Sequence, residues 1–263
     1  MGREAGPGQP GGSGRVRPAP ADQEVPRRRT RSCPSCVNAA RSSFVPMRLL
    51  FLLAVLLVGC DTAEVIPEAD PDPVRAPATY TVTFDATWSA DTHPSDFPGS
   101  SAHFSPLTGA THAPDVTLWE VGGTATEGIR SMAETGAVAT LRAEVEAMGV
   151  STATFVEGGI VGVSPGTATA ELTVTSLRPL ASVVTMLAPS PDWFVGVDRL
   201  DLREGDGWAD RVEVDLVVYD AGTDDGATYT AENAARAMRA PIAEATYGPL
   251  AGTTVGTLTF ERQ

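Results

Sequence analysis

Residues 79–89 alternate strictly between apolar and polar side chains. The apolar positions share one face: Tyr80, Val82, Phe84, Ala86 and Trp88, with threonine or aspartate between them. Successive side chains of a β-strand point to opposite faces, so this period of two predicts a half-buried strand. Similar patterns predict further strands at 116–121, 152–156, 167–176, 182–187, 211–219 and 253–261, separated by clusters of Gly, Pro and Asp.

One segment has a different period. Between residues 127 and 148, Val138, Leu141, Val145 and Met148 recur at spacings of three and four residues, as on one face of an α-helix. Gly136 interrupts the segment and is expected to divide it into two helices. Many short strands with polar loops and little helix predict an all-β fold: an antiparallel β-sandwich with one or two helices inserted around 127–148.

An uninterrupted apolar run lies near the N-terminus. Arg48 precedes ten apolar residues, 49–58, and the run ends in Leu57-Val58-Gly59-Cys60. It is too short to span a bilayer, which takes about 20 residues, but it suits the core of a signal peptide. The last four residues resemble a bacterial lipobox, in which the cysteine receives a lipid. We therefore expect a lipoprotein signal peptide at 47–59 and lipidation of Cys60.

This signal peptide defines the expected domain organisation. Met47 is the expected start, so residues 1–46 are interpreted as a non-native, disordered upstream extension. Residues 60–78 are acidic and rich in proline, a composition that cannot bury a core, and they are expected to form a lipid-anchored tether. Residues 79–263 remain for one folded domain of sizeable core. Its expected place is outside the cytoplasm, anchored to the inner or outer membrane of the envelope or at the cell surface.

Charge narrows the range of partners. Residues 61–263 carry ten arginines and thirty acidic residues, a net charge of −20, and the chain contains no lysine. This balance argues against nucleic acid as a partner and against electrostatic docking on anionic lipid. Cys33 and Cys36 form a CxxC pair, but no second pair of ligands lies nearby to complete a zinc site. No cysteine follows Cys60, so the folded domain is expected to be stabilised by its hydrophobic core and not by disulfide bonds.

Two patterns suggest catalysis and are weighed against structural roles. The segment 162–166 matches GxSxG around Ser164, but an oxyanion hole needs the N–H of the next residue, and Pro165 has none. A turn is the better interpretation. Glu120 and Glu127 could act as paired carboxylates in acid–base chemistry if the fold brought them together.

Three histidines, His93, His103 and His112, fall within twenty residues of one another. Three imidazoles can hold zinc and leave one position open. Their spacings of ten and nine residues match no short ligand pattern, however, and structural hydrogen bonding is the favoured alternative.

Acidic loops offer a different kind of site. Asp220 and Asp224 are four residues apart around a glycine, directly after a predicted strand, and Asp192 stands beside Trp193 after another. Carboxylates from two loops, completed by carbonyls and water, suit calcium, which takes six to eight oxygen ligands. The alternative is that Asp and Gly simply form turns.

The chain resembles a known family in these same segments. They include Trp88-Ser-Ala-Asp-Thr-His-Pro-Ser-Asp-Phe-Pro98, Leu118-Trp-Glu120, Pro189-Ser-Pro-Asp-Trp193, Gly207-Trp208 and Asp220-Ala-Gly-Thr-Asp224. In this order they are similar to the spondin domain of F-spondin and mindin, over about residues 79–262. One departure is that 202–206 lacks the cysteines of the animal proteins.

The resemblance implies a C2-like antiparallel β-sandwich with calcium held by loops at one end, through Asp192, Asp220 and Asp224. Animal members act in matrix adhesion. The expected function is therefore a surface-tethered, calcium-binding adhesion or ligand-binding module without enzymatic activity, whose partner is an extracellular glycan or protein. The alternative is a hydrolase of envelope or extracellular polymer that uses Glu120 or the histidines.

Overall fold

The computed structural model describes residues 74–246, 248–250 and 253–263. The expected upstream extension, signal peptide, Cys60 and most of the tether therefore lie outside the described residues. The strands are β1 (Ala78–Ala86), β2 (His103–Phe104), β3 (Thr108–His112), β4 (Ala153–Glu157), β5 (Gly166–Val174), β6 (Leu180–Ala188), β7 (Trp193–Asp201), β8 (Arg203–Glu204), β9 (Gly207–Trp208), β10 (Arg211–Asp220), β11 (Ala243–Glu244) and β12 (Thr254–Arg262). The helices are α1 (Glu127–Thr135) and α2 (Ala139–Ala147), with short 3-10 turns at Gly99–Ser101 and Gly248–Leu250.

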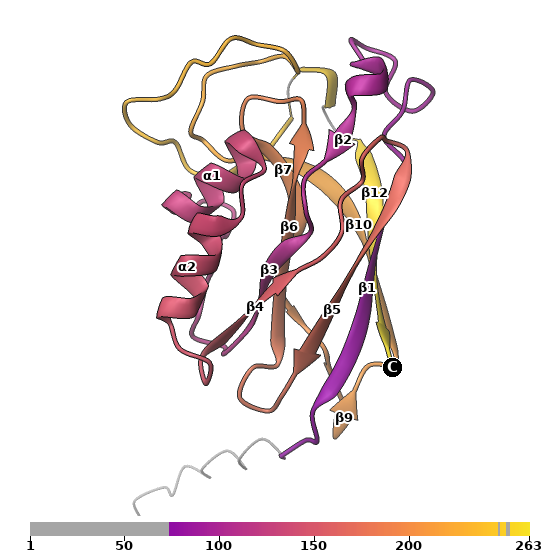
Figure 1. The fold of residues 1–263 in the computed structure, drawn as a ribbon, viewed down its shortest axis with the longest axis vertical. Helices are drawn as coiled ribbons and strands as arrows, with labels where there is room; N and C mark the ends of the chain where they lie inside the picture. Colours follow the sequence, from indigo (N-terminus) through magenta and orange to yellow (C-terminus); the bar gives the residue numbers. More distant parts are fainter. Residues whose placement is uncertain (1–73, 247, 251–252) are drawn as a thin grey trace, which may run out of the picture. The chain divides into compact units, whose positions relative to one another are not determined.

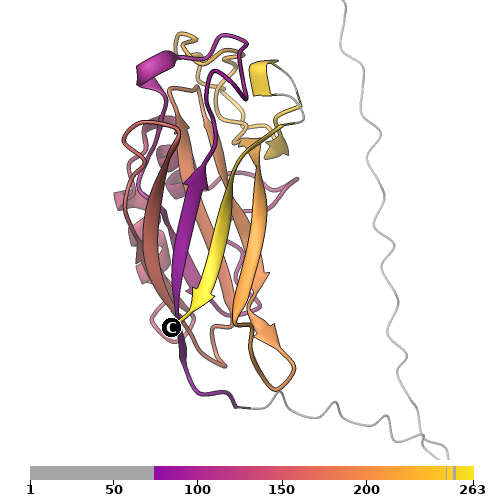
Figure 2. The same ribbon diagram turned by 90° about the vertical axis from the view of Figure 1, so that its right-hand side faces the viewer.

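The large sheet is antiparallel and runs in the order β4-β3-β6-β7-β10-β12-β1-β5. Strand β10 belongs to two layers: it pairs with β12 through residues 211–217 and with β7 through 218–220. Its register shifts between Leu216 and Val217, and such a bulge bends a strand. Layer A (β5-β1-β12-β10) and layer B (β4-β3-β6-β7-β10) thus enclose a core, while β4 and β5 approach each other and nearly close the sandwich (Figures 1 and 2).

The difference between β5 and β6 follows from their surroundings. Strand β5 alternates buried and exposed side chains because only one of its faces meets the core. Every residue of β6 is buried, because one face meets the core between the layers and the other is covered by α1 (Figure 1). The predicted β-sandwich with inserted helices is confirmed.

The two helices cover layer B as an amphipathic pair. Ile129 and Met132 of α1 and Leu141 and Val145 of α2 are almost fully buried, so the predicted spacing is confirmed at Leu141 and Val145. Val138 and Met148 lie outside α2 as its caps, and Met148 is exposed. Thr126 caps α1 by accepting a hydrogen bond from the Ile129 N–H. Gly136 ends α1 with a φ of +70°, a left-handed conformation that glycine adopts without strain. None of the helices in the described part of the chain is long and apolar enough to cross a membrane.

One predicted strand is wrong. Residues 116–121 form a loop with turns, although Val116, Leu118 and Trp119 are buried. The segment is apolar because it covers the outer face of layer B: the Trp119 ring packs edge-on against Phe194 at 5.0 Å. Side-chain burial without strand pairing produces the same sequence pattern. Strands β3 and β7 and the two-residue strands β2, β8, β9 and β11 lie outside the predicted strands.

Candidate metal centre

The three candidate aspartates lie at the end of the sandwich where β7 begins and β10 ends. Asp220, the last residue of β10, pairs in register with Trp193, the first residue of β7. Asp192 directly precedes Trp193, and the Ala221 N–H donates to the Asp192 carbonyl at 3.1 Å. Antiparallel pairing therefore places Asp192 beside the turn that begins at Asp220. We call Asp192, Asp220 and Asp224 with their turn the loop site.

The Asp192 carboxylate is fully buried. Its Oδ2 accepts hydrogen bonds from the Thr223 N–H at 2.7 Å, the Thr223 hydroxyl at 3.1 Å and the Asp224 N–H at 3.0 Å. Its Oδ1 is also buried and has no hydrogen-bond partner among the described residues. Because buried polar atoms are rarely left unpaired, this oxygen is a place where a ligand would be stabilised.

The electrostatics of Asp192 point the same way. Burial raises the pKa of its carboxyl to about 6, and the neighbouring negative charge of Asp220 adds to the rise. The donors from Thr223 and Asp224 act against this rise but do not cancel it. A nearby positive charge would stabilise the ionised form.

The turn that carries Asp220 and Asp224 is held by its own side chains. Asp220 accepts from the Gly222 N–H at 2.6 Å, and Asp224 accepts from the N–H groups of Gly226 and Ala234, both at 2.7 Å. Gly222 has a φ of +73°, and a Cβ there would lie 2.2 Å from the Ala240 carbonyl oxygen. Only glycine fits this position, so the sequence Asp-Ala-Gly-Thr-Asp specifies the turn.

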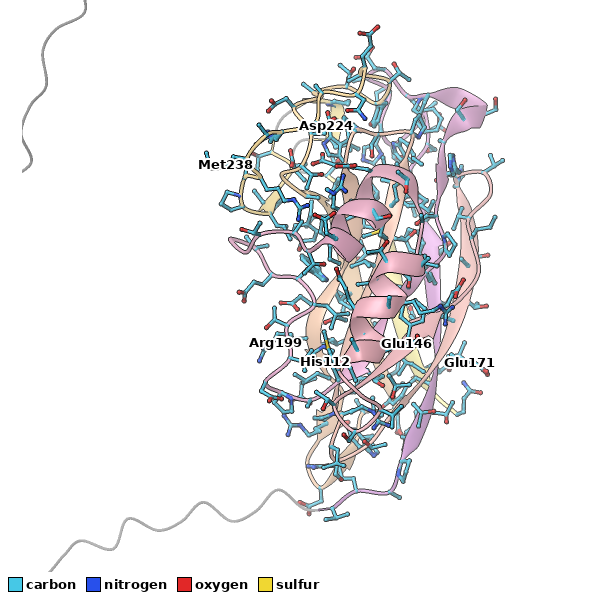
Figure 3. The ribbon with its side chains drawn as sticks, turned by 60° about the vertical axis from the view of Figure 1, so that its left-hand side comes forward. His112, Glu146, Glu171, Arg199, Asp224 and Met238 are labelled. Carbon is cyan, nitrogen blue, oxygen red and sulfur yellow. The ribbon has the colours of Figure 1, made fainter. Side chains whose placement is uncertain are left out.

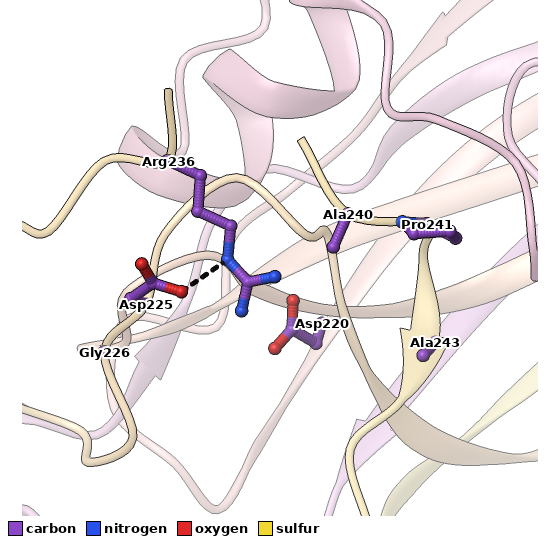
Figure 4. A pocket seen from close by; sticks show the side chains of 7 residues that line it. All are labelled: Asp220, Asp225, Gly226, Arg236, Ala240, Pro241 and Ala243. Atoms are coloured by element: carbon purple, nitrogen blue, oxygen red, sulfur yellow. Dashed lines mark ion pairs between the residues drawn. The ribbon is translucent and has the colours of Figure 1, made fainter. Parts of the chain in front are cut away.

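An arginine lies beside these carboxylates. Arg236 forms an ion pair with Asp225 at 2.8 Å, and its Nε donates to the Asp224 carbonyl at 3.2 Å. Together with Asp220 and neighbouring loop residues it lines a cavity of about 310 Å³ (Figure 4). Arg236 lies in a long loop without a periodic pattern, so no feature of the sequence around it indicates a site.

The donor set fits a hard cation. It consists of carboxylate oxygens with a buried, unpartnered atom at Asp192, and calcium prefers such oxygen ligands. Within the described part of the chain, however, no three His, Cys, Asp or Glu side chains already form a cluster that could hold a metal ion. Backbone carbonyls or water would have to supply the remaining ligands.

The histidines do not form a zinc site. His93 contacts the hydroxyls of Thr92 and Thr253 at 2.8 and 2.7 Å, and His103 is exposed. His112 is buried, with its Nε2 2.9 Å from the Ser182 hydroxyl, and burial lowers its pKa. Each ring has its own structural surroundings.

The other catalytic candidates also have structural contacts. Ser164 is buried and donates to the Trp88 carbonyl at 2.7 Å. Glu127 forms ion pairs with Arg130 and Arg239. Glu120 lies near Asp198 instead, where its charge adds to the effect of burial in raising the pKa of Asp198 to about 6.

The fold and the loop site define an antiparallel β-sandwich with three aspartates gathered at one end. The family model described as Spondin_N matches residues 78–250, and the chain therefore belongs to the Spondin_N family.

Curated relatives agree. Over 177 residues the chain is 38% identical to Spondin-2 of Homo sapiens, covering 65% of this chain and 54% of that protein. It is 34% identical over 209 residues to Spondin-2 of Rattus norvegicus, covering 78% and 63%, and 39% identical over 166 residues to Spondin-1 of Gallus gallus, covering 59% and 20%. The matched region thus covers about one fifth of the length of Spondin-1 and between about half and two thirds of the length of the two Spondin-2 proteins.

Proposed function

We propose that this chain is a calcium-binding adhesion or ligand-binding module of the cell surface, without enzymatic activity. The observation that carries the calcium proposal is the buried, unpartnered Asp192 Oδ1 beside Asp220. Calcium bound by Asp192, Asp220 and Asp224 would neutralise their repulsion and fix two loops against each other. The loops would then present a shaped surface to an extracellular glycan or protein.

Calcium should stabilise the fold. A ligand present at 100 times its dissociation constant adds about 2.7 kcal/mol, which for a domain of this size raises Tm by roughly 5 to 10 °C. We expect EDTA to lower the Tm measured by differential scanning fluorimetry and calcium to restore it. The variant Asp220→Asn/Asp224→Asn keeps oxygens for the amides of the turn but should lose the response to calcium.

A matched control is Asp206→Asn, an exposed aspartate in the loop between β8 and β9. It removes a charge of the same kind away from the loop site and should keep the full calcium response. An unchanged response in the Asp220→Asn/Asp224→Asn variant would exclude this site.

The membrane tether is a separate part of the proposal. Cys60 would carry the lipid that holds the module outside the cytoplasm, and the acidic segment that follows would act as a spacer. Expression with labelled palmitate should give a labelled chain, and Cys60→Ala should abolish the label. Cys33→Ala is the control and should retain it, whereas a labelled Cys60→Ala chain would contradict the lipid anchor.

A hydrolase remains the second candidate, because Glu120 and Asp198 bring two carboxylates to one groove. Paired carboxylates with one raised pKa can perform acid–base catalysis. Turnover of a polysaccharide or peptide polymer that Glu120→Gln abolishes would favour the enzyme. Binding without turnover would favour the module.

A further inference from the structure

A groove opens where layers A and B separate. Strand β10 pairs with β7 only at residues 218–220, and before that point it pairs with β12. Along residues 211–217 of β10 and 197–201 of β7, the two facing strand edges therefore have no ladder between them. Backbone groups on such edges are available to a further strand.

The groove has a volume of about 460 Å³, within the range of sites that hold a small ligand or a peptide side chain. Its walls come from three places. The loop at residues 119–121 forms one, residues 196–200 of β7 another and β10 the third; the lining includes Trp119, Glu120, Asp198, Val214, Asp215 and Tyr219. We call it the layer groove. Its lining combines carboxylates with aromatic rings.

Negative charge in the layer groove is not balanced by its own lining. Glu120, Asp198 and Asp215 supply three carboxylates, and none of the described lining residues is basic. Arg199 follows Asp198 in sequence and its charge lowers the pKa of that carboxyl, while its guanidinium donates to the Thr117 hydroxyl at 2.9 Å and the Pro114 carbonyl at 2.7 Å. One arginine at the edge of the groove thus stands against three carboxylates. The groove is therefore complementary to a cation.

The aromatic lining supplies an independent indication of a ligand. Trp119 is only 5% exposed, and its indole Nε1–H is buried without an acceptor among the described residues. Its ring lies 4.9 Å from that of Tyr219. A buried N–H donor without an acceptor is rare in folded proteins. This N–H is closed to solvent, so a ligand in the groove would reach it only if the Trp119 side chain turns, and such a ligand should bring an acceptor as well as a positive charge.

We propose that the layer groove binds an extended peptide segment of a partner protein through an arginine side chain. A guanidinium carries several N–H donors for the carboxylates and can stack on an aromatic ring such as Tyr219. The peptide backbone brings the carbonyl that Trp119 lacks and can pair with the open strand edges. A neutral polyol would leave the carboxylates uncompensated, and an anion would be repelled.

The inference rests on the proposed role as a binding module, but it does not depend on calcium. The layer groove and the loop site use different side chains, and Figure 3 shows Arg199, next to Asp198, well separated from Asp224. A negative result at one site therefore does not count against the proposal for the other site.

The indole of Trp119 provides the direct measurement. The full-length chain, labelled with ¹⁵N, is titrated with acetyl-Gly-Gly-Arg-Gly-Gly-amide, and the four tryptophan indole signals are followed by NMR. We expect the Trp119 Nε1–H signal to move downfield and saturate as the donor gains an acceptor. The Trp208 indole already donates to the Ala76 carbonyl at 2.7 Å and should not move.

Matched peptides test the chemistry. Citrulline has nearly the shape of arginine without its charge, so the citrulline peptide should bind at least about tenfold more weakly, and the glutamate peptide should not bind. Raising the salt concentration should weaken binding of the arginine peptide. Equal binding of the arginine and citrulline peptides, or no Trp119 shift up to about 10 mM arginine peptide, would overturn the inference.

Variants locate the site. Glu120 and Asp215 are exposed, so Glu120→Gln and Asp215→Asn should leave the fold intact, each weakening the arginine peptide about threefold and together about tenfold. Glu171→Gln, on the exposed face of β5 (Figure 3), removes one charge elsewhere and should bind as the unaltered chain does. Unchanged binding by the double variant would place the peptide elsewhere. A calcium response without peptide binding would refute the groove alone, and the reverse result would refute the loop site alone.

Discussion

The loop site and the layer groove are both acidic, yet they differ in what surrounds their carboxylates. Each contains an aspartate whose pKa is raised to about 6 mainly by burial, Asp192 in the loop site and Asp198 in the layer groove. Asp192 accepts three hydrogen bonds, two of them from the backbone. Asp198 accepts one long bond, 3.5 Å, from the Ser182 hydroxyl. Backbone donors fix a carboxylate in place, whereas a loosely bonded one can turn toward an incoming ligand.

We propose a different ligand for each of these two surroundings. The loop site has carboxylate oxygens held by a tight turn, an arrangement that suits a small hard ion. The layer groove has carboxylates beside the rings of Trp119 and Tyr219, which suits a broad, flat cation. Residue type alone does not distinguish the two sites, because both are built on aspartate.

The largest effect is expected from Asp192→Ala. It leaves the buried N–H groups of Thr223 and Asp224 without an acceptor, and a buried unsatisfied donor costs about 1–3 kcal/mol. We expect the free energy of unfolding, measured by urea denaturation in EDTA, to fall by about 3 kcal/mol. Asp192→Asn keeps an oxygen for these donors and removes the charge that faces Asp220.

In EDTA, the free energy of unfolding of the Asp192→Asn variant should stay within about 1 kcal/mol of that of the unaltered chain. The variant should nevertheless lose the calcium response. Asp198→Ala, the same truncation in the layer groove, should cost less than about 1 kcal/mol because no backbone donor depends on it. Equal losses at the two positions would mean that the backbone hydrogen bonds do not distinguish the sites.

A smaller effect is expected from pH at Asp198. The folded pKa of about 6 lies above the ordinary value of 3.8, so the stability contributed by this carboxyl is fully present below about pH 4. It is lost as the pH rises through 6, because the folded protein must then hold the charge in a half-buried place. Asp198→Asn cannot ionise, so its stability relative to the unaltered chain should rise by about 1 kcal/mol between pH 4.5 and 8, after allowance for solvent screening.

Several groups around Asp198 determine the pKa of its carboxyl. Glu120 raises the pKa, whereas Arg199 and the Ser182 hydroxyl lower it, and burial exceeds each of them. Asp215 and Tyr219 line the same groove. Urea denaturation of both chains across this pH range gives the difference directly, and a difference that stays constant with pH would show that Asp198 is not buried enough to titrate abnormally.

The smallest effect is expected from Glu120→Gln. Removing this charge should let the pKa of Asp198 fall toward its ordinary value, because one source of repulsion is lost. The free energy of unfolding should change by less than about 0.5 kcal/mol, since Glu120 is exposed. Carbon-detected NMR titration of the Asp198 carboxyl measures the change. An unaltered titration would mean that the two carboxylates do not interact.

Periodicity predicted much of the fold because an element that buries only one face repeats its apolar residues at a regular spacing in the sequence. Strand β1 alternates in sequence and in burial, and the helical spacing around Leu141 and Val145 corresponds to α2. Strand β3, only five residues long and fully buried, carries no alternation. Residues 116–121 show the opposite error: their apolar pattern predicts a strand, but they form a loop whose apolar side chains are buried.

The candidate sites were predictable to different degrees. Asp192, Asp220 and Asp224 stand beside strand ends and a glycine, and antiparallel register brings Asp192 next to the turn from Asp220 to Asp224. Their binding of calcium stays a prediction. No spacing in the sequence predicts that Glu120 lies near Asp198 rather than near Glu127. Glu120 and Asp198 are far apart in sequence and lie on different walls of one groove.

The amino-acid order alone reveals the strand periodicity, the divided helix, the acidic turn around Gly222 and the family resemblance, because each depends on residues close together along the chain. Which distant side chains face one another depends on how the chain folds. The tertiary structure buried Asp192 Oδ1 without a partner, gave each histidine separate contacts and opened a groove where β10 leaves β7. Charge and burial act through space, so neither the repulsion between carboxylates nor the unpartnered indole of Trp119 is visible until the chain is folded.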